Sequence, residues 1–180
     1  MKFLVPQQLS DGRFFVRTRT SEDKRVFVQL NKVKLLTQWA EGDDVTLHTE
    51  YDFTSLDNDI LQAAQENSTT WFGREVQAKT IDAAYQRSSS SGTMNMPKSN
   101  KVQVFDVDKS TFDPNELEAE TECDCVIELM GLVFMKKTFS CNWKIVQVRR
   151  KKVPQVSVYN TYLFASDSES EKSEDDDMNL

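Results

Sequence analysis

Aromatic rings alternate with arginines in two short segments near the start of the chain. In residues 12–20, GRFFVRTRT, apolar and polar side chains follow a period of two, which is typical of a half-buried β-strand. One face of that strand carries Phe14, Val16 and Thr18, and the other carries Phe15 with the neighbouring arginines. Exposed rings between cations can stack on nucleobases while the cations neutralise phosphates. The segment therefore indicates a surface for a nucleic acid.

The second segment, KRVFVQL, repeats the pattern. Val26, Val28 and Leu30 share one face, which leaves Arg25, Phe27 and Gln29 on the other. The polar residues 20–23 suit a hairpin turn, so we expect the two segments to pair antiparallel with their apolar faces together. The alternative is a sheet that is buried on both sides, beneath a helix or in a dimer.

Charge is strongly segregated along the chain, which has a net charge of −7. Residues 165–180 contain seven carboxylates and one lysine, so the rest of the chain is nearly neutral. Residues 1–34 and 136–152 are basic, whereas residues 41–66 contain acids without Lys or Arg. Two basic segments that meet in one fold would form an electrostatic footprint for an anionic polymer. Cations scattered over exposed strand faces are the alternative.

Further periodic segments predict a mainly β domain with a helical insertion. Helical spacing from Thr54 to Ala64 and at residues 74–87 predicts two helices, with Trp71 and Phe72 between them as core packing or as a stacking platform. Residues 88–100, SSSSGTMNMPKSN, have the composition of a mobile loop. Period-two segments predict later strands at 45–51, 101–107, 125–134, 142–150 and 156–164.

These elements favour one fold class over others. We expect a mainly β fold: a five-stranded OB-like Greek-key barrel with two inserted helices and a disordered acidic C-terminal tail. The OB-like nucleic-acid-binding domain would occupy residues 1–164, and the tail residues 165–180.

Composition argues against several classes of function. The five glycines form none of the common phosphate-binding or nucleophile motifs, and HExxH is absent, so we expect no enzyme. Three cysteines and the single histidine, His48, provide too few ligands for a structural zinc site, so we expect neither a metal nor a cofactor. No apolar run approaches the roughly 18 residues that span a bilayer, and no secretory signal is present. We therefore expect an intracellular protein that does not enter a membrane.

The order of motifs resembles a known family. Phe14 to Val16 precede SLDNDILQAAQENSTTWFG, and CDCVIELMGLVFMKKTFSCNWKIVQVR follows with Glu128, Gly131 and Trp143 in a late hairpin. Over residues 10–152 this order is similar to the OB-fold single-stranded DNA-binding proteins of nucleocytoplasmic large DNA viruses, which are related to those of short-tailed phages. The resemblance implies single-stranded DNA binding in viral replication, recombination or repair, in the viral factory of the host cytoplasm or in the nucleus.

The predicted interface combines stacking rings with phosphate-binding cations. We expect Phe15, Phe27, Phe139 and Trp143 to stack on bases, and Trp143 is equally suited to the core. Binding of this kind has little sequence preference and depends strongly on salt. The cations that we expect to contact phosphates are Arg13, Arg17, Arg19, Arg25, Lys136, Lys137, Lys144 and Arg149.

The acidic tail ends on apolar residues in the sequence DDDMNL. We expect its carboxylates to shield the basic surface, and the resemblance implies that its apolar end recruits replication proteins. The tail residues concerned are Asp175, Asp176, Asp177, Met178 and Leu180. Self-association as a homodimer stays open. Two other functions do as well: an acidic-tailed, histone-chaperone-like module, and a virion structural or interaction protein without DNA binding.

Overall fold

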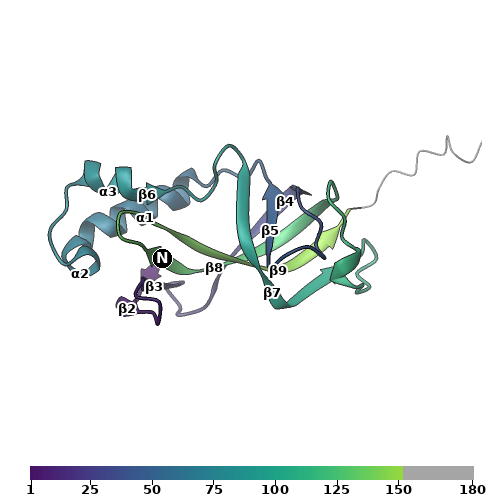
Figure 1. The fold of residues 1–180 in the computed structure, drawn as a ribbon, viewed down its shortest axis with the longest axis horizontal. Helices are drawn as coiled ribbons and strands as arrows, with labels where there is room; N and C mark the ends of the chain where they lie inside the picture. Colours follow the sequence, from purple (N-terminus) through teal and green to yellow (C-terminus); the bar gives the residue numbers. More distant parts are fainter. Residues whose placement is uncertain (152–180) are drawn as a thin grey trace, which may run out of the picture.

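A closed ring of five strands forms the largest part of the computed structural model, which describes residues 1–151 (Figure 1). Around the ring, β4 is followed by β5, β7, β9 and β8, and β8 pairs again with β4. All neighbouring strands are antiparallel except β7 and β9, which are parallel. The predicted mainly β, OB-like barrel is therefore confirmed. Its strands are β4 (Val26–Leu35), β5 (Asp44–His48), β7 (Thr93–Phe105), β8 (Glu122–Phe134) and β9 (Phe139–Arg150).

Alternating apolar side chains close this barrel around one core. Leu30, Leu47, Ile127 and Ile145 come from four different strands and are fully buried together. The strands bend around them at register shifts, one of which lies in β4, where Lys32 has a φ of 55°. A short 3-10 helix, η1 (Pro114–Glu116), lies on the connection from β7 to β8.

The first two predicted strands do not form a hairpin. β3 (Phe14–Arg19) pairs with the C-terminal end of β8, while β4 pairs with the N-terminal part of the same strand. Both run antiparallel to β8 on the edge opposite β9, so β3 and β4 lie in line with residues 20–25 between them. The hairpin prediction was wrong because β8 is 13 residues long and provides pairing for both segments. Two short strands, β1 (Lys2–Phe3) and β2 (Gln7–Gln8), pair with β3.

Helices form a second lobe on the far end of the β8–β9 hairpin. Figure 1 shows them at one end of an elongated molecule and the barrel at the other. Two helices were predicted, but residues 1–151 contain three, because Trp71 and Phe72 lie in a short helix of their own. No helix in this described part is long and apolar enough to span a membrane. The elements of this lobe are α1 (Thr54–Glu66), α2 (Ser68–Phe72), α3 (Ala78–Ala84) and β6 (Tyr85–Gln86), which pairs with β9.

This helical lobe has a core that is separate from the barrel core. Val16 of β3 and Leu132 of β8 are buried there against Ile60, Trp71 and Ile81 of the three helices. The alternative that Trp71 is a core residue is therefore correct.

A buried polar cluster fastens the helical lobe to the hairpin. The Asp57 carboxylate of α1 accepts hydrogen bonds from the Tyr85 and Ser88 hydroxyls, each at 2.7 Å. The Tyr85 hydroxyl also lies 3.3 Å from the Cys141 sulfur of β9. Burial raises the pKa of the Cys141 thiol to about 11 and raises the pKa of Tyr85 as well, so both groups are neutral at pH 7. The buried groups of this cluster satisfy one another's hydrogen bonds. The raised pKa also makes the Cys141 thiol a poor nucleophile.

The predicted mobile loop at residues 88–100 is largely a strand. β7 begins at Thr93, and its residues Met94 and Met96 are buried opposite Leu47 and Val45 of β5. Loop composition was misleading there because the alternating methionines face the barrel core. The predicted strand at 156–164 and the predicted tail at 165–180 lie outside the described residues.

Candidate nucleic-acid interface

A groove of about 930 Å³ lies between the helical lobe and the tip of the β8–β9 hairpin. Its walls come from the turn before β3, from the α2–α3 connection and from residues 135–138 between β8 and β9. We call it the basic groove, and it is defined by the cations Arg13, Arg74, Lys136 and Lys137 together with the exposed ring of Phe14.

The charges of the basic groove are mostly unpaired. Arg74, Lys136 and Lys137 are exposed and form no ion pair with any residue from 1 to 151. Arg13 pairs with Asp11 at 2.6 Å, and its hydrogen bonds lower the pKa of that carboxyl. Since Asp11 is the one carboxylate among the described lining residues, the groove has a clear excess of positive charge.

Packed aromatic rings form the floor of the basic groove. Phe134 and Phe139 stack with their centroids 5.2 Å apart and their planes at 5°. Phe72 meets both rings edge to face, at 5.6 and 5.7 Å, and Trp71 contacts Phe134 in the same way at 5.7 Å. This packing gives Phe14, which is 46% exposed, a rigid apolar base from which to contact a ligand.

Two glycines place the flanking cations. Gly73 ends α2 in a left-handed conformation with a φ of 72°, and Arg74 follows immediately. Gly12 has a φ of 84° in the tight turn before Arg13, where its amide donates to the Leu9 carbonyl. Both turns therefore present an arginine at the edge of the groove.

A second candidate surface lies on the outer face of the barrel sheet. Phe27 of β4 is 51% exposed there, and the Arg25 guanidinium lies 5.6 Å from the centre of its ring. Arg25 also pairs with Glu128 of β8 at 3.1 Å, and Lys144 of β9 lies opposite Glu128 in the sheet. The charge of Arg25 is therefore partly neutralised, in contrast to most cations of the basic groove.

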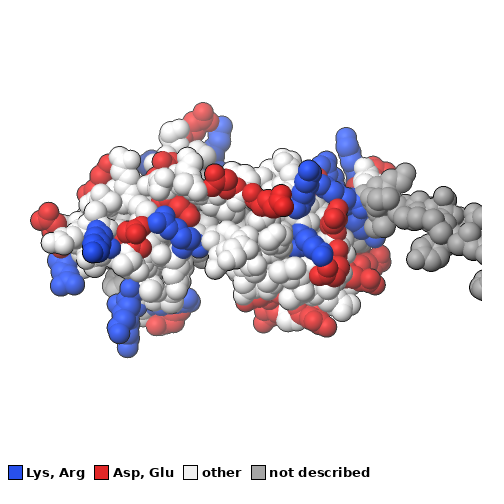
Figure 2. Space-filling model, turned by 90° about the horizontal axis from the view of Figure 1, so that it is seen from above, with Lys and Arg blue, Asp and Glu red and all other residues white. Residues whose placement is uncertain are grey.

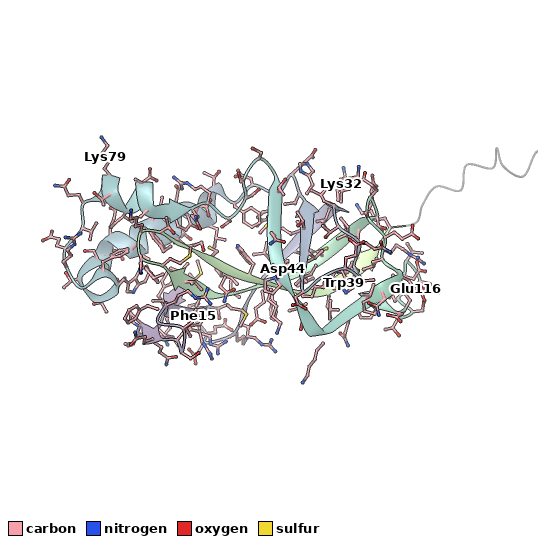
Figure 3. All side chains as sticks on the ribbon, in the orientation of Figure 1. Phe15, Lys32, Trp39, Asp44, Lys79 and Glu116 are labelled. Carbon is pink, nitrogen blue, oxygen red and sulfur yellow. The ribbon has the colours of Figure 1, made fainter. Side chains whose placement is uncertain are left out.

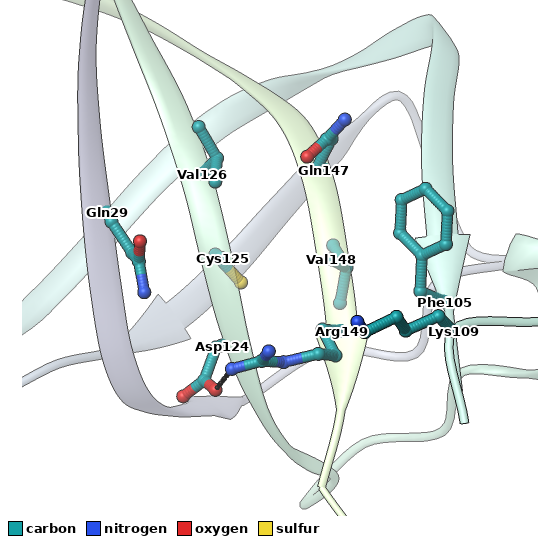
Figure 4. Close-up of a pocket in the computed structure, with 9 residues that line it drawn as sticks. All are labelled: Gln29, Phe105, Lys109, Asp124, Cys125, Val126, Gln147, Val148 and Arg149. Atoms are coloured by element: carbon teal, nitrogen blue, oxygen red, sulfur yellow. Dashed lines mark hydrogen bonds and ion pairs between the residues drawn. The ribbon is translucent and has the colours of Figure 1, made fainter. Parts of the chain in front are cut away.

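The same face contains a hollow of about 350 Å³, which we call the outer hollow (Figure 4). Gln29 of β4 and Gln147 of β9 lie on either side of Val126 in β8, and Phe105 of β7 closes one side. Arg149 crosses the hollow to Asp124 at 2.6 Å. Lys109 completes the lining from the turn after β7.

The structure divides the predicted phosphate-binding residues between these two surfaces. Arg13, Lys136 and Lys137 line the basic groove. Arg25, Lys144 and Arg149 lie on the outer sheet face. Arg17 and Arg19 lie on β3, exposed and half-buried respectively. A single continuous basic face, as the sequence suggested, is therefore not formed.

Three of the four predicted stacking rings are buried, and that part of the prediction was wrong. Phe139 is 1% exposed in the helical-lobe core, and Trp143 is 5% exposed in the barrel core, 5.6 Å from Phe53. Phe15, whose place on the ribbon is labelled in Figure 3, is also buried. Its ring covers Gly131, where an added Cβ would lie 2.7 Å from it. Only Phe27 among the four presents an open ring.

Sequence reasoning missed Phe14 and Arg74. Strict alternation assigned Phe14 to the buried face, but β3 begins at this residue beside the tip of the hairpin, where the ring emerges into the groove. The sequence Trp71-Phe72-Gly73 was a usable signal for Arg74. Helices commonly end at a glycine, which leaves the next residue outside the helix, here beside an aromatic cluster.

The β5–β7 side of the barrel has a different character. Asp44 of β5 is exposed there, and Thr46 bonds to Asn95 of β7. Glu41 and Asp43 belong to the preceding loop, and the Lys98 ammonium is held by backbone carbonyls, including that of Gly42 at 2.8 Å. OB barrels commonly bind oligonucleotides on the second and third barrel strands, which are β5 and β7 in this protein. Glu41, Asp43 and Asp44 disfavour phosphates at that position.

Charge is also mixed on the face seen in Figure 2. Lys and Arg side chains lie at both ends of the molecule among Asp and Glu, with a largely uncharged band between the two lobes. Residues 1–151 contain no cluster of three His, Cys, Asp or Glu side chains that could hold a metal. The thiols of Cys123 and Cys125 are buried and free, with their sulfur atoms 3.6 Å apart.

A family model described as "Family of unknown function (DUF5871)" matches residues 31–166. The chain belongs to this family. The DUF5871 region thus includes the whole barrel except residues 26–30 of β4, together with the helical lobe. A comparison with curated proteins gives no significant match.

Three solved structures of one phage protein are similar to this DUF5871 chain. The single-stranded DNA-binding protein from bacteriophage Enc34 is 11% identical, with a TM-score of 0.46, over 85% of this chain and 91% of that chain. Its complex with single-stranded DNA is 12% identical, with a TM-score of 0.45, over 83% and 96%. Its C-terminal truncation is 10% identical, with a TM-score of 0.47, over 84% and 96%. The assignment to nucleocytoplasmic large DNA viruses stays a prediction.

Proposed function

We propose that the protein binds single-stranded DNA in the basic groove. The observation that carries this proposal is the set of three cations, Arg74, Lys136 and Lys137, that form no ion pair with residues 1–151 and surround the exposed ring of Phe14. A single strand exposes both its phosphates and the flat faces of its bases, so it can use the cations and the ring together.

The basic groove is suited to an unpaired strand by its mixture of groups. Its cations lie at the edge, where they can follow a phosphate backbone, and its floor is apolar and aromatic. The bases of a duplex are stacked on each other, so a duplex would use the cations alone. We therefore expect weaker binding of double-stranded DNA, with little preference among base sequences.

We also propose a biological process for the protein and a role for residues 165–180. The sequence resemblance supports a role in viral DNA replication, recombination or repair. Residues 165–180 carry seven carboxylates, and this charge is complementary to the basic groove. We propose that Asp175–Asp177 shield the groove when DNA is absent, and that Met178 and Leu180 contact a replication protein. The absence of enzymatic activity, the intracellular location and a homodimer stay predictions.

The test is a fluorescence anisotropy titration of labelled oligo(dT) with the full chain. The double variant Lys136→Glu, Lys137→Glu should bind at least about 100-fold more weakly at 50 mM salt, because two attractive charges become repulsive. Lys24→Glu is the matched control, since Lys24 is an exposed lysine that pairs with Glu22 away from the groove. Equal affinity of the double variant and the wild type would overturn the proposal.

A further inference from the structure

The outer hollow lies on a different face of the sheet from the basic groove. On the β8–β9 hairpin, Phe134 faces the helical lobe and the groove, while Val133 and Gly131 face the opposite side. The outer hollow lies on that opposite side, where β8 presents Val126 between Gln29 and Gln147. The two concave surfaces are therefore on different faces of one sheet.

Two amide side chains, Gln29 and Gln147, line the outer hollow. Gln147 donates through Nε2 to Oε1 of Gln103 at 3.1 Å, and Gln29 donates through Nε2 to Asn31 at 2.9 Å. These bonds fix the orientation of the amides and leave the Oε1 acceptors of Gln29 and Gln147 without a partner in residues 1–151. Fixed amides at an open surface suit the hydrogen-bonding edges of nucleobases.

The hollow also has an apolar base and cations at one end. Val126 forms its floor beside the ring of Phe105. Asp124 is paired with both Arg149 at 2.6 Å and Lys151 at 3.2 Å, so this cluster has an excess of one positive charge. Lys109 extends toward Arg149 and forms no ion pair within the described part of the chain. The charge at this end is therefore suited to one phosphate.

Cations also lie along the path between the two surfaces. Arg17 lies opposite Gly131 and Lys144 opposite Glu128, on the outer side of the sheet. Neither Arg17 nor Lys144 forms an ion pair with another residue of the described range. A strand that leaves the groove around the hairpin tip would meet them before it reached the hollow.

We propose that the outer hollow binds one nucleotide of the strand that occupies the basic groove, with the base against Phe105 and Val126 and the phosphate near Lys109. This proposal rests on the proposed function and adds a second contact point to it. A volume of about 350 Å³ lies in the range of small-ligand sites. Phe134 and Val126 are eight positions apart on β8, or about 26 Å, so only a strand of several nucleotides can reach both surfaces.

The test compares oligo(dT) of about 4 and about 16 nucleotides, which bracket the usual site sizes of OB folds. The variant Gln29→Ala, Gln147→Ala removes two exposed amides without disturbing the core. We expect it to bind the long oligonucleotide about tenfold more weakly and the short one as the wild type does. Gln65→Ala, an exposed amide on α1, is the matched control. In NMR spectra, the side-chain amide signals of Gln29 and Gln147 should shift with the long oligonucleotide alone.

Failure of this inference is distinguishable from failure of the proposed function. If the long oligonucleotide binds both amide variants equally and leaves the Gln29 and Gln147 signals in place, the outer hollow is not a nucleotide site, and the groove is unaffected. If Lys136→Glu, Lys137→Glu leaves both oligonucleotides bound at wild-type affinity, the groove itself is refuted. An effect of the amide variant on the short oligonucleotide would also contradict a second, separate contact point.

Discussion

The basic groove and the outer sheet face both contain Arg and Lys side chains, but several of these side chains differ in ion pairing. In the groove, Arg74, Lys136 and Lys137 are free of ion pairs with described residues, whereas Arg25 and Arg149 on the outer face are held by Glu128 and Asp124. An unpaired cation that neutralises a phosphate releases the counterion condensed on the DNA there, while a paired arginine must first give up its carboxylate. Under the proposed function, we expect the groove to supply more of the affinity and the outer face to supply contacts to bases.

The two surfaces also differ in what builds them. The groove lies at the helical end of the molecule, because its walls come from the helices, from the turn before β3 and from the hairpin tip. The outer hollow is made by barrel strands and the turn after β7 alone. A change that loosens the helical lobe should therefore weaken the groove and leave the hollow intact.

The largest expected effect comes from Asp57→Ala. This change leaves the Tyr85 and Ser88 hydroxyls buried without their acceptor, so we expect a loss of about 3 kcal/mol in the free energy of unfolding. Hydrogen exchange should accelerate in the three helices more than in the barrel strands. Asp59→Ala, at an exposed position of the same helix, should have little effect. Equal acceleration in both lobes would mean that they do not open separately.

Alkaline pH should act on the same attachment. Because burial raises the pKa of Cys141 to about 11, the folded state retains a proton that the unfolded state loses near pH 9. The stabilisation is complete below pH 9 and is lost as the pH rises through 11, with about 2 kcal/mol gone by pH 10.5. Chemical denaturation at pH 8 and 10.5 measures it. Cys141→Ala should reduce this pH dependence, and an unchanged dependence would assign it to other groups.

Removal of the groove's open ring should weaken DNA binding. Phe14→Ala should cost about 1.5 kcal/mol of binding free energy with both short and long oligo(dT), because one base loses its stacking partner. Tyr51→Ala removes a ring of similar exposure that lines neither surface, and it should not change affinity. Similar losses for the two variants would show that the effect is unspecific.

The smallest expected effect is that of Phe27→Ala. Its ring is open on the outer face, but its arginine partner stays paired with Glu128 in the variant. We expect a loss of about 1 kcal/mol with long oligo(dT) and none with short oligo(dT). Calorimetry with both lengths measures the difference, and a larger loss with the short oligonucleotide would place Phe27 in the primary site.

The sequence was informative about elements and less so about their partners. Period-two patterns predicted most of the barrel strands. The basic segment between β8 and β9 was also recognised, and its lysines, Lys136 and Lys137, line the groove. Pairing was harder, because the polar residues 20–23 look like a hairpin turn. In the structure they connect two strands that share β8 as a partner, a non-local arrangement that turn chemistry does not report.

Faces were predictable only where one side of a strand meets a core. β3 packs on the helical lobe through Val16 and covers Gly131 with Phe15 on its other side, so both of these residues are buried. Phe14 emerges because it lies at the end of the strand beside the groove. Residues 93–100 were read as a loop from their Ser, Gly and Pro neighbours, although Met94 and Met96 already had the spacing of a strand.

The salt dependence of oligo(dT) binding tests the central claim most directly. For single strands the slope of log K against log salt is about −0.7 for each neutralised phosphate. We predict that Lys136→Ala, Lys137→Ala reduces the magnitude of this slope by about 1.4, while Arg25→Ala, which removes a paired cation, leaves it nearly unchanged. The same slope in the lysine variant as in the wild type would contradict a groove in which these unpaired cations bind the phosphates.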